Sequence, residues 1–207
     1  MSEPKSKQPT KQRLLQAACE VFAENGYRGA TVAEICKRAE ANIAAVNYHF
    51  GDKERLYIAA WRRALDVAIE KYPLDGGVPH DAPPEERLHG RIESLIRKTM
   101  DEGEVGHMMR FLVAEISMPS GKVLEALTET VQPLRRTMLE LVRELAGEEM
   151  SDQDVVIIST SIYNICSGLV LRPEMRKNFF GKVGIDQDMI IDTATRLVLG
   201  GIKEMCK

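Results

Sequence analysis

Apolar residues recur three and four positions apart along most of this 207-residue chain. This spacing gathers them on one side of an α helix, whereas a half-buried strand would alternate apolar and polar residues. No segment shows convincing alternation, so the pattern predicts an all-α protein. Helices are expected at about residues 10–25, 31–39, 42–49, 52–72, 88–99, 107–117, 122–145, 154–171 and 186–205.

Two short segments near the N-terminus carry clear helix-start signals. Thr31, followed three residues later by Glu34, forms a capping box, and Asn42 is a good N-cap for a second short helix. A tight turn at Glu40 and Ala41 would join the two helices. The pattern predicts a helix-turn-helix, although a purely structural helix pair would show the same pattern.

The outward face of the second short helix is suited to DNA. Its small residues, such as Ala44, let the backbone approach base-pair edges, while asparagine, tyrosine and histidine side chains donate hydrogen bonds to bases and phosphates. Asp52 is expected to cap a third helix that carries Lys53 near its start, where a phosphate would lie. We therefore interpret this face as a DNA-reading surface.

The segment TVAEICKRAEANIAAVNYHFGDKERLY, residues 31–57, resembles the helix-turn-helix signature of TetR-family transcriptional regulators. The resemblance covers about the first quarter of the chain. Together with AEISMPSGKVLEAL and a later Gln-Pro-Leu, it is similar to the CecR-like branch of that family. The resemblance implies contacts to double-stranded DNA from Thr31, Asn42, Ala44, Asn47, Tyr48, His49 and Lys53.

One residue departs from the family pattern. Glu40 occupies the turn position that usually holds glycine. A left-handed conformation costs a non-glycine residue about 1 kcal/mol, and a carboxylate near phosphates is unfavourable. The departure predicts either a wider turn or a lower affinity for DNA.

The chain is expected to have two domains. Residues 1–52 would form a three-helix DNA-binding head, and residues 53–207 a helical body for ligand binding and dimerisation, with Asp52–Tyr72 as the connecting helix. Residues 73–86 contain four prolines and a Gly-Gly pair, so they cannot stay helical. The protein has a net charge of −3, which divides into +3 for residues 1–71 and −6 for the remainder. This division is compatible with DNA contact through one end.

Several classes of function are not favoured. The N-terminus lacks the apolar region of a signal peptide, and no apolar run reaches the ~18 residues of a membrane span, so a cytoplasmic location and no membrane partner are expected. The four cysteines lie far apart and are interpreted as buried free thiols, and the four histidines lack metal-ligand spacing. Without a catalytic motif, we expect no metal, no cofactor and no enzymatic activity.

The helix at 154–171 is apolar on most sides, and the last helix has small residues that allow close helix approach, so the pair predicts a four-helix dimer interface. Its expected residues are Ile158, Ile162, Ile165, Leu169, Ile191, Ala194, Val198 and Ile202; an intramolecular core is the alternative. Methionine-rich helices of the body predict a pocket for a small, largely apolar ligand. Its expected residues are Met100, Met108, Phe111, Leu112, Glu115, Met138, Tyr163 and Asn164; an ordinary core is again the alternative.

The sequence thus predicts a homodimeric repressor that a small-molecule effector releases from a palindromic operator. Two alternatives remain at this point. One is a constitutive DNA-binding protein or a partner-binding adaptor without an effector, and the other is a helical enzyme. An inducer that releases DNA would separate the first reading from the second, and a palindromic operator would separate both DNA-binding readings from an enzyme.

Overall fold

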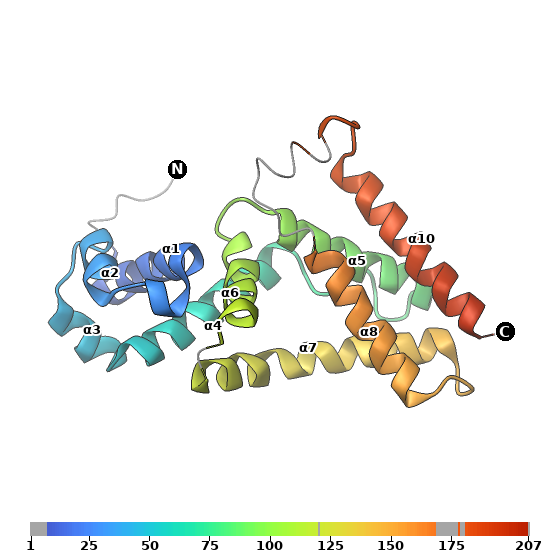
Figure 1. Ribbon diagram of the computed structural model, residues 1–207, viewed down its shortest axis with the longest axis horizontal. Coiled ribbons are helices and arrows are strands. Elements are labelled where there is room, and N and C mark those ends of the chain that lie inside the picture. The colour runs from blue at the N-terminus through green and yellow to red at the C-terminus, as the bar shows by residue number, and fades with distance from the viewer. Residues whose placement is uncertain (1–7, 120, 169–177, 179–180, 207) are drawn as a thin grey trace. The chain divides into compact units, whose positions relative to one another are not determined.

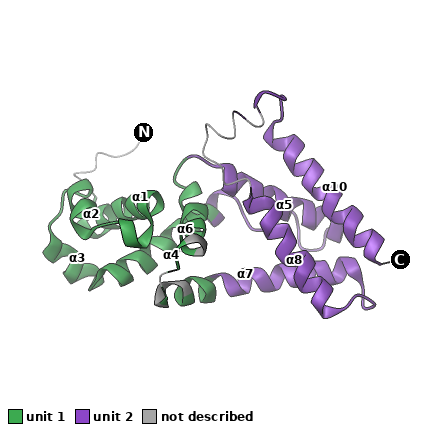
Figure 2. Cartoon of the chain, viewed as in Figure 1, with its two compact units in different colours: residues 1–68, 103–130 green, residues 69–102, 131–207 purple. Residues whose placement is uncertain are grey.

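A computed structural model describes residues 8–119, 121–168, 178 and 181–206 of the chain. These residues form α helices and no strand, which confirms the predicted all-α class (Figure 1). No helix among them is long and apolar enough to cross a lipid bilayer. The chain divides into two compact units, and each is described by itself (Figure 2).

The first unit contains residues 1–68 and 103–130. Its N-terminal helices are α1 (Thr10–Gly29), α2 (Val32–Arg38) and α3 (Ile43–Phe50), followed by most of α4 (Lys53–Lys71). Helix α6 (Gly106–Ser117) packs against α1 and belongs to the same unit. The units therefore do not coincide with the boundary predicted after residue 52, because a helix from the expected body lies with the head.

Aromatic side chains form the centre of the first unit. Tyr57 and Trp61 of α4 are fully buried, as are Phe22 of α1 and Phe111 of α6. The Tyr57 ring lies edge-on to Phe22, with 4.7 Å between ring centroids, and 5.0 Å from Phe111. Such pairs add to the stability gained from burying their surface. This shared core fixes α1, α4 and α6 under the helix-turn-helix.

Helix α1 consists of two helical segments that meet at a kink at Gly26. The sequence predicted a stop at Asn25 and Gly26, and Gly26 does leave helical geometry, with φ of 65° and ψ of 178°. A further helical turn then runs to Gly29. Glycine tolerates this backbone conformation at little cost, so the regular helix is interrupted at Gly26, as the sequence predicted.

The second unit contains residues 69–102 and 131–207. Helix α5 (Pro84–Met100) packs against α8 (Asp152–Ser167) and α10 (Gln187–Met205). Helix α7 (Lys122–Ala146) runs past Pro133 and contributes its later part to this unit. The core is a single apolar cluster from these four helices, which includes Ile92, Met138, Val142, Ile162 and Val198.

A glycine pair sets the path of the segment between α4 and α5. A methyl group on Gly90 of α5 would lie 2.2 Å from the Asp75 carbonyl oxygen, and one on Gly76 would lie 2.5 Å from the Gly90 carbonyl oxygen. Neither position has room for a side chain, and Gly76 has a positive φ of 67°. The segment after α4 therefore lies directly on the middle of α5.

Candidate nucleic-acid interface

The first helix of the predicted helix-turn-helix begins at its predicted cap. The Thr31 hydroxyl accepts a hydrogen bond from the Glu34 amide at 3.1 Å. The return half of the capping box is replaced, because the Glu34 carboxylate accepts from the Arg38 guanidinium at 3.3 Å. The start of α2 is thus fixed by the threonine alone.

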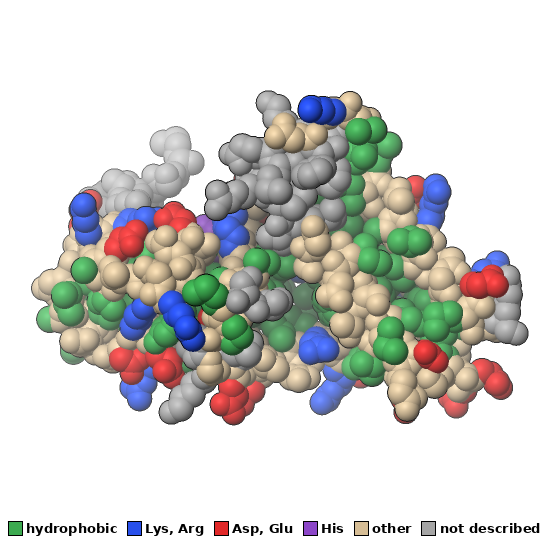
Figure 3. Space-filling view, in the orientation of Figure 1, with side chains coloured by type: hydrophobic (Ala, Val, Ile, Leu, Met, Phe, Trp, Pro, Cys, Tyr) green, Lys and Arg blue, Asp and Glu red, His purple; other side chains and the backbone are tan. Residues whose placement is uncertain are grey.

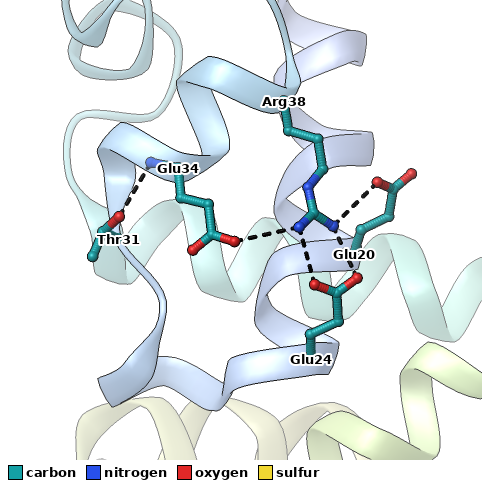
Figure 4. A network of polar contacts seen from close by, with 5 residues as sticks. All are labelled: Glu20, Glu24, Thr31, Glu34 and Arg38. Atoms are coloured by element: carbon teal, nitrogen blue, oxygen red, sulfur yellow. Dashed lines mark hydrogen bonds and ion pairs between the residues drawn. The ribbon is translucent and has the colours of Figure 1, made fainter.

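Arg38 ties α2 to α1 through two carboxylates of α1, Glu20 and Glu24 (Figure 4). It donates two hydrogen bonds to Glu24, at 2.9 and 3.0 Å, and lies 3.6 Å from Glu20. Two parallel bonds from one guanidinium to one carboxylate fix orientation as well as distance. The hydrogen bond from Arg38 lowers the pKa of Glu24. The contact is largely exposed, so we assign it to the placement of α2 more than to stability.

The turn after α2 is tight even though it lacks glycine. Glu40 adopts a left-handed φ of 50°. The Ala41 amide donates to the Cys36 carbonyl at 2.9 Å and the Glu40 amide to the Lys37 carbonyl at 3.3 Å, which is the Schellman pattern of a helix end. Arg13 of α1 donates to the Ala39 carbonyl at 3.0 Å. The prediction of a wider turn is therefore wrong, because a tight turn forms with Glu40 in the position that usually holds glycine.

The second helix, α3, presents the predicted reading face. The Asn42 side chain caps it by accepting from the Ala45 amide at 2.8 Å. Val46 is buried and anchors the helix, whereas Ala44, Asn47 and Tyr48 are exposed, Tyr48 to 85%. A large aromatic side chain with so little contact in the free chain is available to a partner. His49 is half-buried, with its ring 4.9 Å from that of Tyr48.

Lys53 lies where the sequence placed it, at the first position of α4, but part of its side chain is already engaged. The ammonium sits over the Tyr27 ring, 4.6 Å from the centroid. Burial lowers the pKa of Lys53. A cation held over an aromatic face loses freedom, so less entropy remains to be lost when it meets a phosphate. Tyr27 is a functional candidate that the sequence reading missed.

A concave surface joins these elements. Its lining includes Arg13, Lys37, Ala44, Ala45, Tyr48 and His49, and also Glu40. Basic and hydrogen-bonding groups surround a helix with small residues along its exposed side, which suits insertion into the major groove. Glu40 adds one negative charge to this surface.

The predicted effector residues fall in both compact units. Met108, Phe111, Leu112 and Glu115 belong to the first unit, and Met100, Met138, Tyr163 and Asn164 to the second. Within the first unit, Glu115 is buried and accepts a hydrogen bond from the Tyr57 hydroxyl at 3.0 Å. Burial and the adjacent Glu115 carboxylate both raise the pKa of Tyr57. Within the second unit, Met138 lies in the core, and the Tyr163 hydroxyl donates to the Leu134 carbonyl at 3.3 Å.

The predicted dimer residues are mostly part of the core of the second unit. The buried ones are Ile162, Ile191, Ala194, Val198 and Ile202. Ile158 packs partly on the same core, Ile165 is 37% exposed, and Leu169 lies outside the described residues. These five side chains pack within the core of their own unit, which was the alternative to a dimer interface. Helical spacing identifies an apolar stripe without showing whether the same chain or another one covers it.

Two buried polar groups of the second unit escaped the sequence reading. Lys98 of α5 is 2% exposed and Arg91 is 7% exposed. Both lie one or two positions from apolar residues of the α5 stripe, and because charged residues are usually exposed, the apolar spacing alone does not indicate their burial. Three of the four cysteines are buried as predicted, whereas Cys206 is exposed. The described residues contain no group of three metal-ligating side chains.

These features define a helix-turn-helix DNA-binding protein, and comparison with known proteins places it in a family. The profile for "Bacterial regulatory proteins, tetR family" matches residues 14–60, and that for "HTH-type transcriptional dual regulator CecR, C-terminal domain" matches residues 84–202. The chain belongs to the TetR family of transcriptional regulators, with a CecR-type C-terminal domain. The family assignment confirms a DNA-binding transcriptional regulator and not an enzyme.

Relatives and solved structures agree with this assignment. The chain is 27% identical over 161 residues to the dual regulator CecR of Shigella flexneri, which covers 71% of this chain and 69% of that protein. It has the fold of AibR, which was solved in complex with isovaleryl coenzyme A and operator DNA. The TM-score is 0.72 at 15% sequence identity, and the match covers 91% of this chain and 97% of AibR. FadR from Bacillus subtilis, in complex with stearoyl-CoA, has a TM-score of 0.68 at 17% sequence identity. The match covers 92% of this chain and 98% of FadR.

Proposed function

We propose that this regulator is a homodimeric repressor of a palindromic operator and that a small ligand with a large apolar part releases it. The observation that carries the DNA-binding half is the exposed face of α3, with Ala44, Asn47 and Tyr48 projecting from a helix that is capped, anchored and braced. By this proposal Thr31, Asn42, His49 and Lys53 complete the contact surface around α3. Repression is the simplest output of a protein that occupies an operator.

The dimer proposal rests on the outer surface of α8 and α10. Apolar side chains are visible on the surface of the second unit (Figure 3). Ile157 of α8 is 60% exposed and Leu197 of α10 is 63% exposed. A methyl group added to Gly200 or Gly201 would meet nothing within 4 Å, so another helix can approach closely there. We assign the dimer contact to this outer face, in place of the five buried residues named from sequence.

Dimerisation and DNA binding are linked in this proposal. Two recognition helices related by a two-fold axis enter successive major grooves about 34–36 Å apart. A single half-site offers too few contacts to hold the protein at physiological salt. Loss of the dimer therefore removes operator binding as well.

Selection of bound duplexes from a random pool tests the proposal. We expect enrichment of an inverted repeat with half-sites one helical turn apart. A single unrepeated half-site would contradict the homodimer, and the absence of any enriched sequence would contradict sequence-specific binding. Transcription from a promoter that carries the selected site should fall when the protein is added, and a rise would contradict repression.

Leu197→Asp tests the dimer surface directly. The variant should sediment as a folded monomer and lose affinity for the selected duplex. Val183→Asp, at an apolar residue that is 72% exposed and lies outside α8 and α10, is the matched control and should remain dimeric. A dimeric Leu197→Asp protein would place the contact elsewhere.

The effector half of the proposal is supported by the relatives. FadR and AibR have the same fold and were solved with acyl-coenzyme A ligands. In this chain the expected pocket residues of the second unit, Met100, Met138 and Tyr163, all pack in or against its core. Release of the selected duplex by an added metabolite would support an effector. Unchanged binding across a broad metabolite pool would favour a constitutive regulator.

A further inference from the structure

Helix α5 carries a lysine inside the second unit. Lys98 is 2% exposed, and its ammonium donates to the Ser94 hydroxyl at 2.9 Å. That hydroxyl in turn donates to the Tyr72 carbonyl at 3.3 Å. An ammonium has three protons to donate, and among the described residues no carboxylate forms an ion pair with Lys98. The lysine is therefore incompletely satisfied.

A second cation lies on the same side of α5. Arg91 is 7% exposed and lies seven residues, or about two turns, before Lys98. Its partners are neutral: the Leu134 carbonyl, at 2.8 Å, and the Thr137 hydroxyl. No ion pair joins Arg91 to a carboxylate of the described residues. Two positive charges thus line the buried face of α5, and no carboxylate of the described residues forms an ion pair with either of them.

Asp75 is the carboxylate that acts on Lys98 electrostatically, but it is committed elsewhere. It is exposed, and its Oδ1 accepts from the Gly77 amide at 3.0 Å. Burial lowers the pKa of Lys98 to about 8, with a further reduction from Arg91 and an opposing increase from Asp75. At neutral pH most of the protein therefore still carries the charge on Lys98.

A buried charge without a partner is costly, so proteins normally pair it or neutralise it. An apolar residue of similar length would avoid this cost at position 98. The same unit also buries the Thr99 hydroxyl and the Ser159 hydroxyl of α8, neither of which has a hydrogen-bond partner among the described residues. Three polar groups of this unit therefore remain partly or wholly unsatisfied in the free chain.

We propose that Lys98 binds the carboxylate of an apolar organic acid within the second unit. The ammonium and the Ser94 hydroxyl would hold the acid group, and apolar residues of the same unit, such as Met138 and Ile92, would contact its hydrocarbon part. One ammonium neutralises a carboxylate, whereas a doubly charged phosphate would bury an excess negative charge. This inference rests on the proposed function in one respect: the bound acid is the effector that releases the operator.

The test measures the thermal midpoint of the full-length protein with and without ligand at pH 7. The acids are octanoate, decanoate, benzoate and phenylacetate, and the neutral controls are octanamide and octanol. Octanoyl-coenzyme A supplies the same chain without a free carboxylate. Lys98→Met removes the charge while keeping the length of the side chain, and Lys182→Met, at an exposed lysine, is the matched control.

At least one acid should raise the thermal midpoint of the wild type and of Lys182→Met by several degrees. The neutral analogues should leave both midpoints unchanged. None of the acids should raise the midpoint of Lys98→Met. If Lys98→Met does not fold by circular dichroism, Lys98→Gln replaces it. The proposal is overturned if no acid in the set acts on the wild type, if the rise persists without Lys98, or if the amide and coenzyme A derivative act as well as the acid.

Duplex binding separates this result from the proposed function. If an acid binds through Lys98 while the selected duplex stays bound, the anion site stands and the effector role fails. If the acid releases DNA equally from Lys98→Met, regulation by the acid stands and the anion site fails. The two ideas can therefore be rejected independently.

Discussion

Helices α3 and α5 place polar side chains on opposite sides. On α3 they point outward, with Tyr48 85% exposed, while a single valine anchors the helix beneath. On α5 Lys98 and Arg91 point inward and Leu88, Ile92 and Ile96 surround them along the same helix. An exposed polar face is ready for a macromolecule that arrives from solvent, whereas a buried cation is suited to a small ligand that enters the fold.

The largest expected effect is on the exposed face. Ala44→Asp places a carboxylate on α3 where the sugar-phosphate backbone and base edges would approach. Like charges brought together across an interface cost several kcal/mol, so affinity for the selected duplex should fall on the order of 1,000-fold. Fluorescence anisotropy of the labelled duplex measures this affinity.

His89→Asp, at an exposed position on α5, is the control and should bind the duplex as the wild type does. If both variants bind equally well, α3 does not enter DNA and the contrast between the two helices disappears.

The next effect concerns the buried face. Lys98→Met should raise the free energy of unfolding at pH 7 by on the order of 3 kcal/mol in the absence of ligand, because the cost of burying the ammonium disappears. Urea denaturation measures the difference. A less stable Lys98→Met protein would show that Lys98 has a structural role.

The advantage of Lys98→Met should depend on pH. The pKa of Lys98 is about 8 in the folded chain and about 10.5 when unfolded, so between these values the unfolded state binds more protons. Wild-type stability relative to the variant therefore rises with pH across that window. The stability difference should narrow from pH 7.5 to 10, and a constant difference would argue against titration of Lys98.

A buried hydrogen bond in the first unit gives a smaller effect. Tyr57→Phe removes the donor that Glu115 accepts at 3.0 Å and leaves a buried carboxylate less satisfied. Stability should fall by about 1–3 kcal/mol. The effect should shrink when Glu115→Ala is introduced as well, because the acceptor of the Tyr57 hydroxyl is then already absent. Additive losses in this double-mutant cycle would mean that the two residues act separately.

Lys53→Ala tests the cation at the start of α4. If its ammonium neutralises one phosphate per subunit, the slope of log affinity against log salt should become shallower by about 1 for each half-site. Tyr27→Leu should produce part of the same loss, because it removes the ring under the ammonium. An unchanged slope in Lys53→Ala would remove Lys53 from the DNA contacts.

The smallest effect is expected at the turn. Glu40→Gly should raise stability by up to about 1 kcal/mol, because glycine tolerates a φ of 50° better than glutamate does. It should also strengthen DNA binding modestly by removing a carboxylate from the surface that faces DNA in this proposal. Glu40→Gln, which keeps the strain and removes the charge, separates the two contributions. Weaker DNA binding by both variants would give Glu40 a positive role.

The same contrast explains what sequence can predict. The caps at Thr31 and Asn42 act within three residues, so their hydrogen bonds follow from local sequence. The packing of α6 on α1 joins segments far apart in the chain, and no local pattern encodes it. Val198 fits an apolar stripe whether the stripe meets its own chain or another one. Lys98 fits neither rule, because a charged residue is usually exposed and its contact with Ser94, which donates to the Tyr72 carbonyl, forms only when the chain after α4 packs on α5.

Repeating the duplex selection with Asn47→Ala tests the central claim most directly. If α3 reads the operator, the enriched inverted repeat should lose preference at one base pair in each half-site, at symmetric positions, and keep the rest. Circular dichroism of the variant should match the wild type, since Asn47 is exposed. An enriched sequence identical to that of the wild type would show that Asn47 reads no base, and a similar result for Tyr48→Ala would remove α3 as the reading helix.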